Sequence, residues 1–315
     1  MAAYQKLFKS GELAERVRKA RSLLKNCRLC GHACQIDRLG GIVGKCGTDR
    51  QTVVSSYGPH FGEEAPLVGR WGSGTIFFTN CSLKCIFCQN YSISQLGEGT
   101  SIGSKALAQM MLDLQQRGCH NINLVSPTHQ VPQILEALEL AVAGGLSLPL
   151  VYNTGGYDSP EVLAILDGIV DIYMPDMKYS DEATARRLSG VKDYPRINQN
   201  AVKEMHRQVG DLAIDDYGVA LRGLLVRHLV LPHGLAGTEG IVSFLAKQVS
   251  RNTYLNIMAQ YHPCHHAFEF PGLDRPLSGK EFVQAVKMAI NCGLARLDGL
   301  HTASAVGILY TPDEA

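Results

Sequence analysis

Apolar, strand-like runs alternate with helical patterns along most of this chain, and this alternation restricts the fold more than any other feature. The runs lie at residues 74–80, 122–125, 149–152, 171–174, 224–231 and 254–259, with a further short one at 294–297. Apolar residues recur at helical spacing between them, and Ser159 followed by Pro160 is a typical helix start. Six strands with intervening helices predict a parallel β/α architecture. Periodicity alone leaves a partial barrel of six units and an open doubly wound sheet as alternatives.

The part of the sequence before the first run is organised differently. Residues 10–24 predict an amphipathic helix, whose apolar face is formed by Leu13, Val17, Ala20 and Leu24. Residues 52–57 predict a short strand that ends at a turn formed by residues 58–59. We therefore expect residues 1–51 to form a small extension. Residues 52–315 are enough for one large α/β domain.

Three cysteines begin one residue after the first run of the alternating part. Cys81, Cys85 and Cys88 are spaced C-x3-C-x2-C, with Phe87 before the third. Their crowding and the expected lack of a secretory leader argue against disulfides. Residues 89–92 offer no fourth nitrogen or sulfur ligand for zinc. Three thiolates can hold three irons of a 4Fe–4S cluster, whereas an electron-transfer cluster has four cysteine ligands. The spacing predicts a cluster with one open iron, at a strand end where α/β folds place their chemistry.

An open iron has a chemical use. It can bind the amino and carboxylate groups of S-adenosylmethionine (SAM) and pass one electron to the sulfonium, which yields a 5′-deoxyadenosyl radical. We therefore expect an enzyme that cleaves SAM reductively and abstracts hydrogen from a substrate. Such a cluster is oxygen-sensitive, so we expect an anaerobic host or anaerobic handling. An iron–sulfur electron carrier or assembly protein is the alternative, and SAM turnover distinguishes the two.

A second group of cysteines lies in the N-terminal extension. Its members are Cys27, Cys30, Cys34 and Cys46, spaced C-x2-C-x3-C-x11-C among several glycines that let the backbone fold tightly around a metal. Four thiolates suit tetrahedral zinc and a fully ligated 4Fe–4S cluster alike. Zinc knuckles usually carry two C-x2-C pairs and only one is present here. The pattern therefore favours a second cluster modestly and leaves zinc open.

Composition limits the class of protein further. The 315 residues carry a formal net charge of +1, so nothing favours a nucleic-acid partner. Hydrophobic residues make up 45% of the chain, and no apolar run is long enough to span a bilayer. We expect a soluble enzyme with no membrane partner. Ten cysteines in such a chain predict a reducing cytoplasm and metal ligation.

Taken in order, these motifs resemble a known family. Residues 81–88 are similar to the cysteine motif of the radical SAM superfamily, and four later segments narrow the resemblance to the pyruvate formate-lyase activating enzyme family. Those segments are residues 121–129, 152–156, 171–178 and 256–261. The nearest match is a branch of uncharacterised homologues with an N-terminal cysteine motif. The resemblance covers nearly the whole chain and implies a partial (β/α)6 radical SAM barrel with a small Cys-rich extension.

The same resemblance implies a SAM pocket. By position it places Asn153, Thr154, Met174 and Asp176 around a monovalent cation, and Lys178 beside the SAM carboxylate. Oxygen ligands suit a hard cation, and a lysine suits a carboxylate. The alternative interpretation is a structural ion pair between Asp176 and Lys178 at a strand end.

Two departures from the family pattern affect this pocket. Asn153 stands where the family has an acidic residue, which lowers the negative charge at the implied cation site. Residues 126–129 replace a Gly-Gly-Glu-type loop that accepts a hydrogen bond from the SAM amino group. Ser126 or Thr128 can offer an oxygen there instead. His129 can act as a substrate acid or base, although a lone loop histidine is more often structural.

The remaining candidates are weaker. Residues 260–266 contain several metal-type ligands after a strand and could face the barrel mouth, but a surface loop with incidental histidines is the favoured interpretation. Cys119 and Cys292 are expected to be buried small hydrophobes.

The resemblance also suggests partners. It implies a reductant such as flavodoxin or ferredoxin, and hydrogen abstraction from a glycine of a partner protein, as in glycyl-radical activation. A small-molecule or peptide substrate is equally open.

Overall fold

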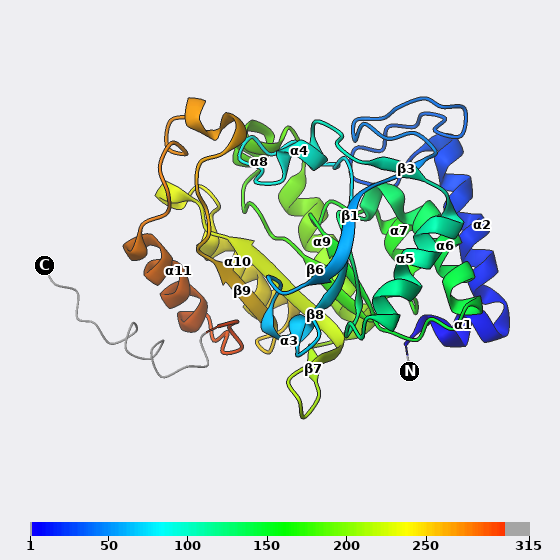
Figure 1. The fold of residues 1–315 in the computed structure, drawn as a ribbon. Helices are drawn as coiled ribbons and strands as arrows, with labels where there is room; N and C mark the ends of the chain where they lie inside the picture. Colours follow the sequence, from blue (N-terminus) through cyan, green and yellow to red (C-terminus); the bar gives the residue numbers. More distant parts are fainter. Residues whose placement is uncertain (1, 300–315) are drawn as a thin grey trace, which may run out of the picture.

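Six parallel strands form the centre of the computed structural model, which describes residues 2–299 (Figure 1). They are β2 (Ser73–Phe78), β4 (Ile122–Val125), β5 (Leu150–Thr154), β6 (Ile172–Pro175), β8 (Ala220–Leu229) and β9 (Tyr254–Met258). Each pairs with the next one along the chain. A doubly wound sheet reverses its strand order at a switch point, and this sheet does not. With helices outside it, the arrangement is the expected partial (β/α)6 barrel.

Shorter strands extend the sheet at its edges. β1 (Thr52–His60) and β3 (Thr100–Ile102) continue it antiparallel beyond β2, and β7 (Ala213–Ile214) pairs antiparallel with β8. The turn predicted at residues 58–59 is wrong, because β1 continues through Pro59, which lies opposite Gly74. The pairing with β3 ends at Val54, so Pro59 lies on an unpaired edge, where a missing N–H costs little.

Helices surround the barrel on its outer side (Figure 1). The longer ones are α1 (Tyr4–Ser10), α2 (Glu12–Ser22), α5 (Ser104–Gln116), α6 (Val131–Ala143), α7 (Pro160–Leu166), α8 (Glu182–Ser189), α9 (Tyr194–Val209), α10 (Thr238–Phe244) and α11 (Gly279–Asn291). Two shorter helices are α4 (Tyr91–Ser94) and α3 (Ala65–Val68), and α3 lies inside the barrel rather than in the outer layer. Ser159 caps α7 as expected, because its Oγ accepts a hydrogen bond from the Val162 N–H. Within residues 2–299 no helix has the length and apolar character needed to cross a bilayer.

Some local predictions need correction. The sequence did not predict α1 or α8. The strand expected at residues 294–297 is reduced to a single bridge between Leu255 and Leu297. Cys119 is buried as expected, whereas Cys292 is half-buried and packs against the edge of the core.

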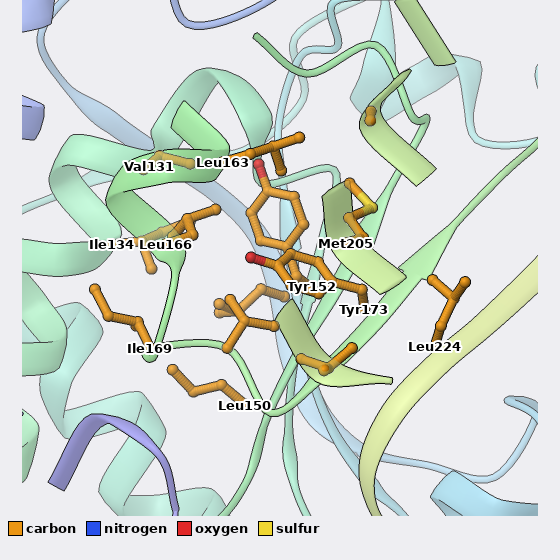
Figure 2. Packing of buried hydrophobic residues seen from close by; sticks show 14 of the residues in the cluster. Val131, Ile134, Leu150, Tyr152, Leu163, Leu166, Ile169, Tyr173, Met205 and Leu224 are labelled. Atoms are coloured by element: carbon orange, nitrogen blue, oxygen red, sulfur yellow. The ribbon is translucent and has the colours of Figure 1, made fainter. Parts of the chain in front are cut away.

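The main core lies between the strands and their covering helices. Figure 2 shows Tyr152 of β5 and Tyr173 of β6 at its centre, with Leu163 and Met205 from the helix layer beside them. The apolar face predicted for residues 10–24 is buried in this same cluster, where α2 packs against α6 and α7. The N-terminal extension therefore shares the core of the barrel.

The opposite faces of the strands form a second cluster inside the barrel, because side chains alternate along a strand. Val151, Ile172, Met174 and Leu225 meet there, and Leu67 of α3 packs among them. The Asn121 side chain, just before β4, donates a hydrogen bond to the Leu67 carbonyl. Helix α3 therefore fills the barrel at the amino ends of its strands.

His129 is a buried structural residue. Its side chain is 1% exposed, and Nε2 lies 2.9 Å from the Thr79 carbonyl oxygen, just beyond β2. Nδ1 has no hydrogen-bond partner among residues 2–299. Burial lowers the pKa of His129 to about 4. The imidazole is therefore neutral at neutral pH and ties the loop after β4 to the end of β2, which favours the structural interpretation over an acid or base role.

The burial of the His129 imidazole predicts that the protein loses stability in acid. An unfolded histidine titrates near about 6.5, so the unfolded chain binds more protons than the folded one between that pH and the folded pKa of about 4. Stability is therefore complete above the unfolded pKa and falls as the pH is lowered through this window. At pH 5, His129 should reduce the free energy of unfolding by roughly 2 kcal/mol relative to pH 7.

Urea denaturation at a series of pH values measures this effect. His129→Gln should flatten the pH dependence by that amount, because glutamine can still donate to Thr79 and does not titrate. His262→Gln, at an exposed position, serves as the matched control and should leave the slope unchanged. Equal slopes for wild type and His129→Gln would contradict the interpretation.

Candidate active site

The three-cysteine loop borders a cavity at the carboxyl ends of the central strands. The cavity has a volume of about 140 Å³. Its wall includes Cys81, Cys85, Cys88, Ser126, Asn153, Thr154, Asp176, Lys178 and Arg227. Parallel pairing places Asn153 opposite both Val125 and Met174, so these strand ends meet at one edge. The structure thus brings the predicted cluster cysteines and most of the predicted SAM-side residues together.

The backbone adopts an uncommon conformation at two of these strand ends. Asn80, directly before Cys81, has φ 71°, and Ser126, directly after β4, has φ 57°. Non-glycine residues rarely enter this region, and those that do cluster at functional sites. Hydrogen bonds hold both: the Asn80 N–H donates to the Ile93 carbonyl, and the Ser126 N–H donates to the Asn153 carbonyl, each at 2.9 Å.

Cys85 is buried, whereas Cys81 and Cys88 are partly exposed. Burial raises the pKa of Cys81 to about 12, with smaller contributions from the Cys85 and Cys88 thiols. Burial also raises the pKa of Cys85, although the Lys178 ammonium opposes the shift. Ser189 Oγ donates a hydrogen bond to Cys85 Sγ at 2.9 Å. Without a metal such thiols stay protonated at neutral pH, and a metal would bind them as thiolates.

The spacing of the thiols distinguishes between kinds of metal centre. In the described part of the chain, no three His, Cys, Asp or Glu side chains converge closely enough to hold one metal ion. A single zinc ion requires its sulfur ligands at about 2.3 Å from one point. A cubane cluster makes a different demand, because each cysteine binds a different iron. Three thiols around the wall of one cavity are compatible with such a cluster.

Asp176 is the charged centre of the cavity wall. Its Oδ2 accepts a hydrogen bond from Lys178 Nζ at 2.6 Å, and its Oδ1 accepts one from Arg227 Nε at 2.9 Å. Burial opposes ionisation of Asp176, but Arg227 and Lys178 hold its pKa below the usual range. The ion pair of the alternative interpretation therefore exists, and it lies in the cavity itself. Two cations beside one carboxylate make this wall suitable for a further carboxylate.

Arg227 on β8 is the site residue that the sequence analysis missed. Besides Asp176, its Nη2 donates to Asn153 Oδ1 at 2.8 Å, and its Nη1 lies 3.8 Å from Glu63 Oε2. The sequence did contain a signal for Arg227, because this charged residue stands within the apolar run predicted at 224–231. A charge that is buried needs a partner, so this position required one from another element.

Two predicted ligands use their side chains elsewhere. The hydroxyl groups of Thr128 and Thr154 each donate to the buried Asp158 carboxylate at 2.7 Å. Thr128 is buried and lies outside the cavity wall, which leaves Ser126 as the predicted oxygen that faces it. The Met174 side chain lies in the cluster inside the barrel.

The segment at residues 260–266 lies against the cysteine loop. The His266 N–H donates to the Ile86 carbonyl at 2.9 Å, and Cys264 Sγ donates to the Phe87 carbonyl at 3.1 Å. The side chains of His262 and His266 are exposed. The expectation of a surface loop is confirmed, and the segment also supports the backbone that carries Cys85 and Cys88.

The four N-terminal cysteines lie together. Burial raises the pKa of Cys30, and the thiols of Cys27, Cys34 and Cys46 raise it further, so all four are within electrostatic reach of one another. The fully buried side chain of Arg38 lies beside them. Its Nη1 is 3.8 Å from Cys27 Sγ, and its other nitrogens donate to the Asp49 carbonyl.

This N-terminal segment contacts the loop of the other cysteines. His32 Nε2 lies 2.8 Å from the Ser82 carbonyl oxygen, and Asn80 Nδ2 donates to the Gly47 carbonyl at 3.2 Å. The Gly31 N–H donates to the Tyr157 carbonyl at 3.0 Å. The two cysteine groups are therefore neighbours in the fold.

Comparison with solved structures finds similar folds at low sequence identity. A radical SAM methyltransferase from Sphaerobacter thermophilus is 14% identical, with a TM-score of 0.48, over 70% of this chain and 64% of its own. TYW1 with a lysine-pyruvate adduct is 12% identical, with a TM-score of 0.42, over 69% of this chain and 73% of its own. SuiB of Streptococcus suis, bound to its precursor peptide SuiA, is 12% identical, with a TM-score of 0.48, over 73% of this chain and 49% of its own.

Comparison with known sequences finds a closer relationship. No family model matches the chain. The uncharacterized protein MJ0674 of Methanocaldococcus jannaschii is 32% identical over 283 residues, which cover 87% of this chain and 77% of that protein. At this identity and coverage, the chain belongs to the same family as the Methanocaldococcus jannaschii protein MJ0674.

Proposed function

We propose that the chain is a radical SAM enzyme, in which Cys81, Cys85 and Cys88 hold a 4Fe–4S cluster and the adjoining cavity binds SAM. One observation carries the proposal: the three cysteines line the same cavity as Asp176 and Lys178. Three cysteine ligands leave one iron of a cubane open to a substrate. A cavity with two cations suits the carboxylate of an amino acid.

When bound, the cluster and SAM supply one-electron cleavage of the sulfonium and a 5′-deoxyadenosyl radical. The chain's own residues bind and orient SAM and exclude water from the cavity. Lys178 is fixed by Asp176 and has further N–H donors for the SAM carboxylate. The Ser126 hydroxyl is the oxygen available to the SAM amino group. The buried side chain of Cys85 helps to exclude water from the cluster side of the cavity.

The substrate and partners are proposed from the resemblance described for the sequence. A glycine of a partner protein, as in glycyl-radical activation, is the first substrate class, and a small molecule or peptide is the second. A flavodoxin or ferredoxin is the proposed reductant, in a reducing and anaerobic cytoplasm. A glycyl-radical enzyme encoded beside this gene would favour the first class.

We also infer a second metal centre at Cys27, Cys30, Cys34 and Cys46. The supporting observation is Arg38, whose guanidinium is fully buried and makes no ion pair with a carboxylate among residues 2–299. A buried cation requires negative charge nearby, and metal-bound thiolates supply it. A 4Fe–4S cluster is modestly favoured over zinc, since zinc knuckles usually carry two C-x2-C pairs and this stretch has one.

The first prediction concerns the three-cysteine cluster. Alanine substitution at Cys81, Cys85 or Cys88 should reduce 5′-deoxyadenosine formation by at least about 100-fold, because each removes a thiolate that holds the SAM-binding centre. The measurement uses anaerobically reconstituted protein with dithionite and SAM. Cys292→Ala, at a half-buried position outside the cavity wall, is the matched control and should retain the wild-type yield. Unchanged yield in the three variants would overturn the assignment. A wild-type protein with intact clusters and no SAM cleavage would favour an electron carrier.

The second prediction concerns the N-terminal centre. The triple variant of Cys81, Cys85 and Cys88 should still contain about four irons with sulfide, or about one zinc, per chain, since the other four thiolates remain. Iron, sulfide and zinc analysis of the purified variant measures this. Further replacement of Cys30 should remove the remaining metal. A triple variant that retains neither iron nor zinc would count against a second centre.

A further inference from the structure

The guanidinium of Arg227 lies in a cage of oxygen atoms from three different elements. Nε faces Asp176 Oδ1 at 2.9 Å, Nη2 faces Asn153 Oδ1 at 2.8 Å, and Nη1 faces Glu63 Oε2 at 3.8 Å. Asn153 belongs to β5, Asp176 follows β6, and Glu63 lies in the loop between β1 and α3. Each of the three guanidinium nitrogens thus faces an oxygen atom of a different residue.

Two of these oxygens belong to residues that the resemblance places around a monovalent cation. The other two implied ligands have side chains engaged elsewhere: the Thr154 hydroxyl donates to Asp158, and Met174 is packed inside the barrel. The position that a cation would take between Asn153 and Asp176 is therefore filled by a side chain of the protein.

The charges around Arg227 also argue against a dissociable cation at this position. Lys178 and Arg227 both pair with the Asp176 carboxylate, and the other acids that act on Arg227 are Glu64 and Glu63. Burial raises the pKa of Glu63, although Arg227 opposes the shift. A dissociable cation would have to enter a site that already holds two fixed ones. Coulomb repulsion between the two fixed cations and a third one disfavours its binding, because a buried site screens charge less than water does.

We infer that Arg227 replaces the dissociable cation of the SAM pocket, so that this protein binds SAM independently of monovalent cations. The inference rests on the proposed SAM site. In this arrangement Arg227 is a positioning residue: it fixes Asp176 and Asn153, and Asp176 in turn fixes Lys178 for the SAM carboxylate.

Equilibrium dialysis of SAM against the reconstituted protein tests the inference. Binding is compared in potassium chloride, sodium chloride and N-methyl-D-glucamine chloride at equal ionic strength. The wild-type Kd should agree within about twofold in all three salts. Arg227→Gln, which removes the cation and opens space in the cage, should bind SAM at least about tenfold more weakly in N-methyl-D-glucamine, with part of the loss restored by potassium or sodium.

Thermal unfolding of the reconstituted protein in the absence of SAM provides a readout that does not depend on SAM. Arg227→Gln should unfold at a higher temperature in potassium or sodium chloride than in N-methyl-D-glucamine chloride, because small cations occupy the vacated cage, and the wild type should not. Arg222→Gln is the matched control, since Arg222 is exposed on the same strand and donates to the Gln208 carbonyl outside the cavity. Arg227→Lys keeps the charge and should stay independent of added cations.

Two results would overturn the inference: wild-type protein whose SAM affinity rises about tenfold or more with potassium or sodium, or Arg227→Gln that matches wild type in every salt. If Arg227→Gln does not fold, the wild-type comparison alone decides. Wild-type protein that binds no SAM in any salt would refute the proposed function, and the thermal measurements would then decide separately whether Arg227 occupies a cation cage.

Discussion

The in-register pairing of parallel strands is the constraint on which the rest of the site depends. Val125, Asn153 and Met174 lie side by side on β4, β5 and β6, and a bridge between Asp176 and Arg227 continues the pattern to β8. Side chains alternate along each strand, so a slip of one residue would turn Asn153 or Asp176 away from the cavity. The chemistry of the cavity wall is therefore set by backbone hydrogen bonds that run the length of the barrel.

Two buried carboxylates, Asp176 and Asp158, show how the environment of a group decides its charge. Asp176 is held between two cations, which lower its pKa despite burial. Asp158 accepts hydrogen bonds from three hydroxyl groups and has no cationic partner among them, so burial raises its pKa. The first carboxylate places fixed charge in the cavity. The second ties Thr128, Tyr152 and Thr154 together below it, which makes the strand ends rigid without adding charge to the wall.

Much of the fold could be predicted from the sequence, because strands buried on both faces appear as continuous apolar runs. The cysteine groups and the Asp176–Lys178 pair could also be found, since their spacing along the chain carries the signal. The partners of Arg227 could not, because Asp176 is 51 residues away and Glu63 is further still, and only the fold brings them together. Asp158 was missed although two of its hydrogen-bond donors, Tyr152 and Thr154, are near it in the sequence on β5; the third, Thr128, lies 30 residues away in the turn after β4. The predicted turn at Pro59 failed because the strand lies on a sheet edge, where proline is tolerated.

The contact between the N-terminal segment and the barrel imposes a size limit on one residue. A Cβ atom at Gly31, directly after Cys30, would lie 2.5 Å from a ring carbon of Tyr157 and 2.7 Å from the end of Ile197. Both neighbours are anchored, one in the loop before α7 and the other in α9. The cysteine spacing alone therefore does not define how this segment docks. A protein with the same four cysteines but a larger residue after the second must hold them further from its barrel, which turns this single position into a marker for homologues that share the close arrangement.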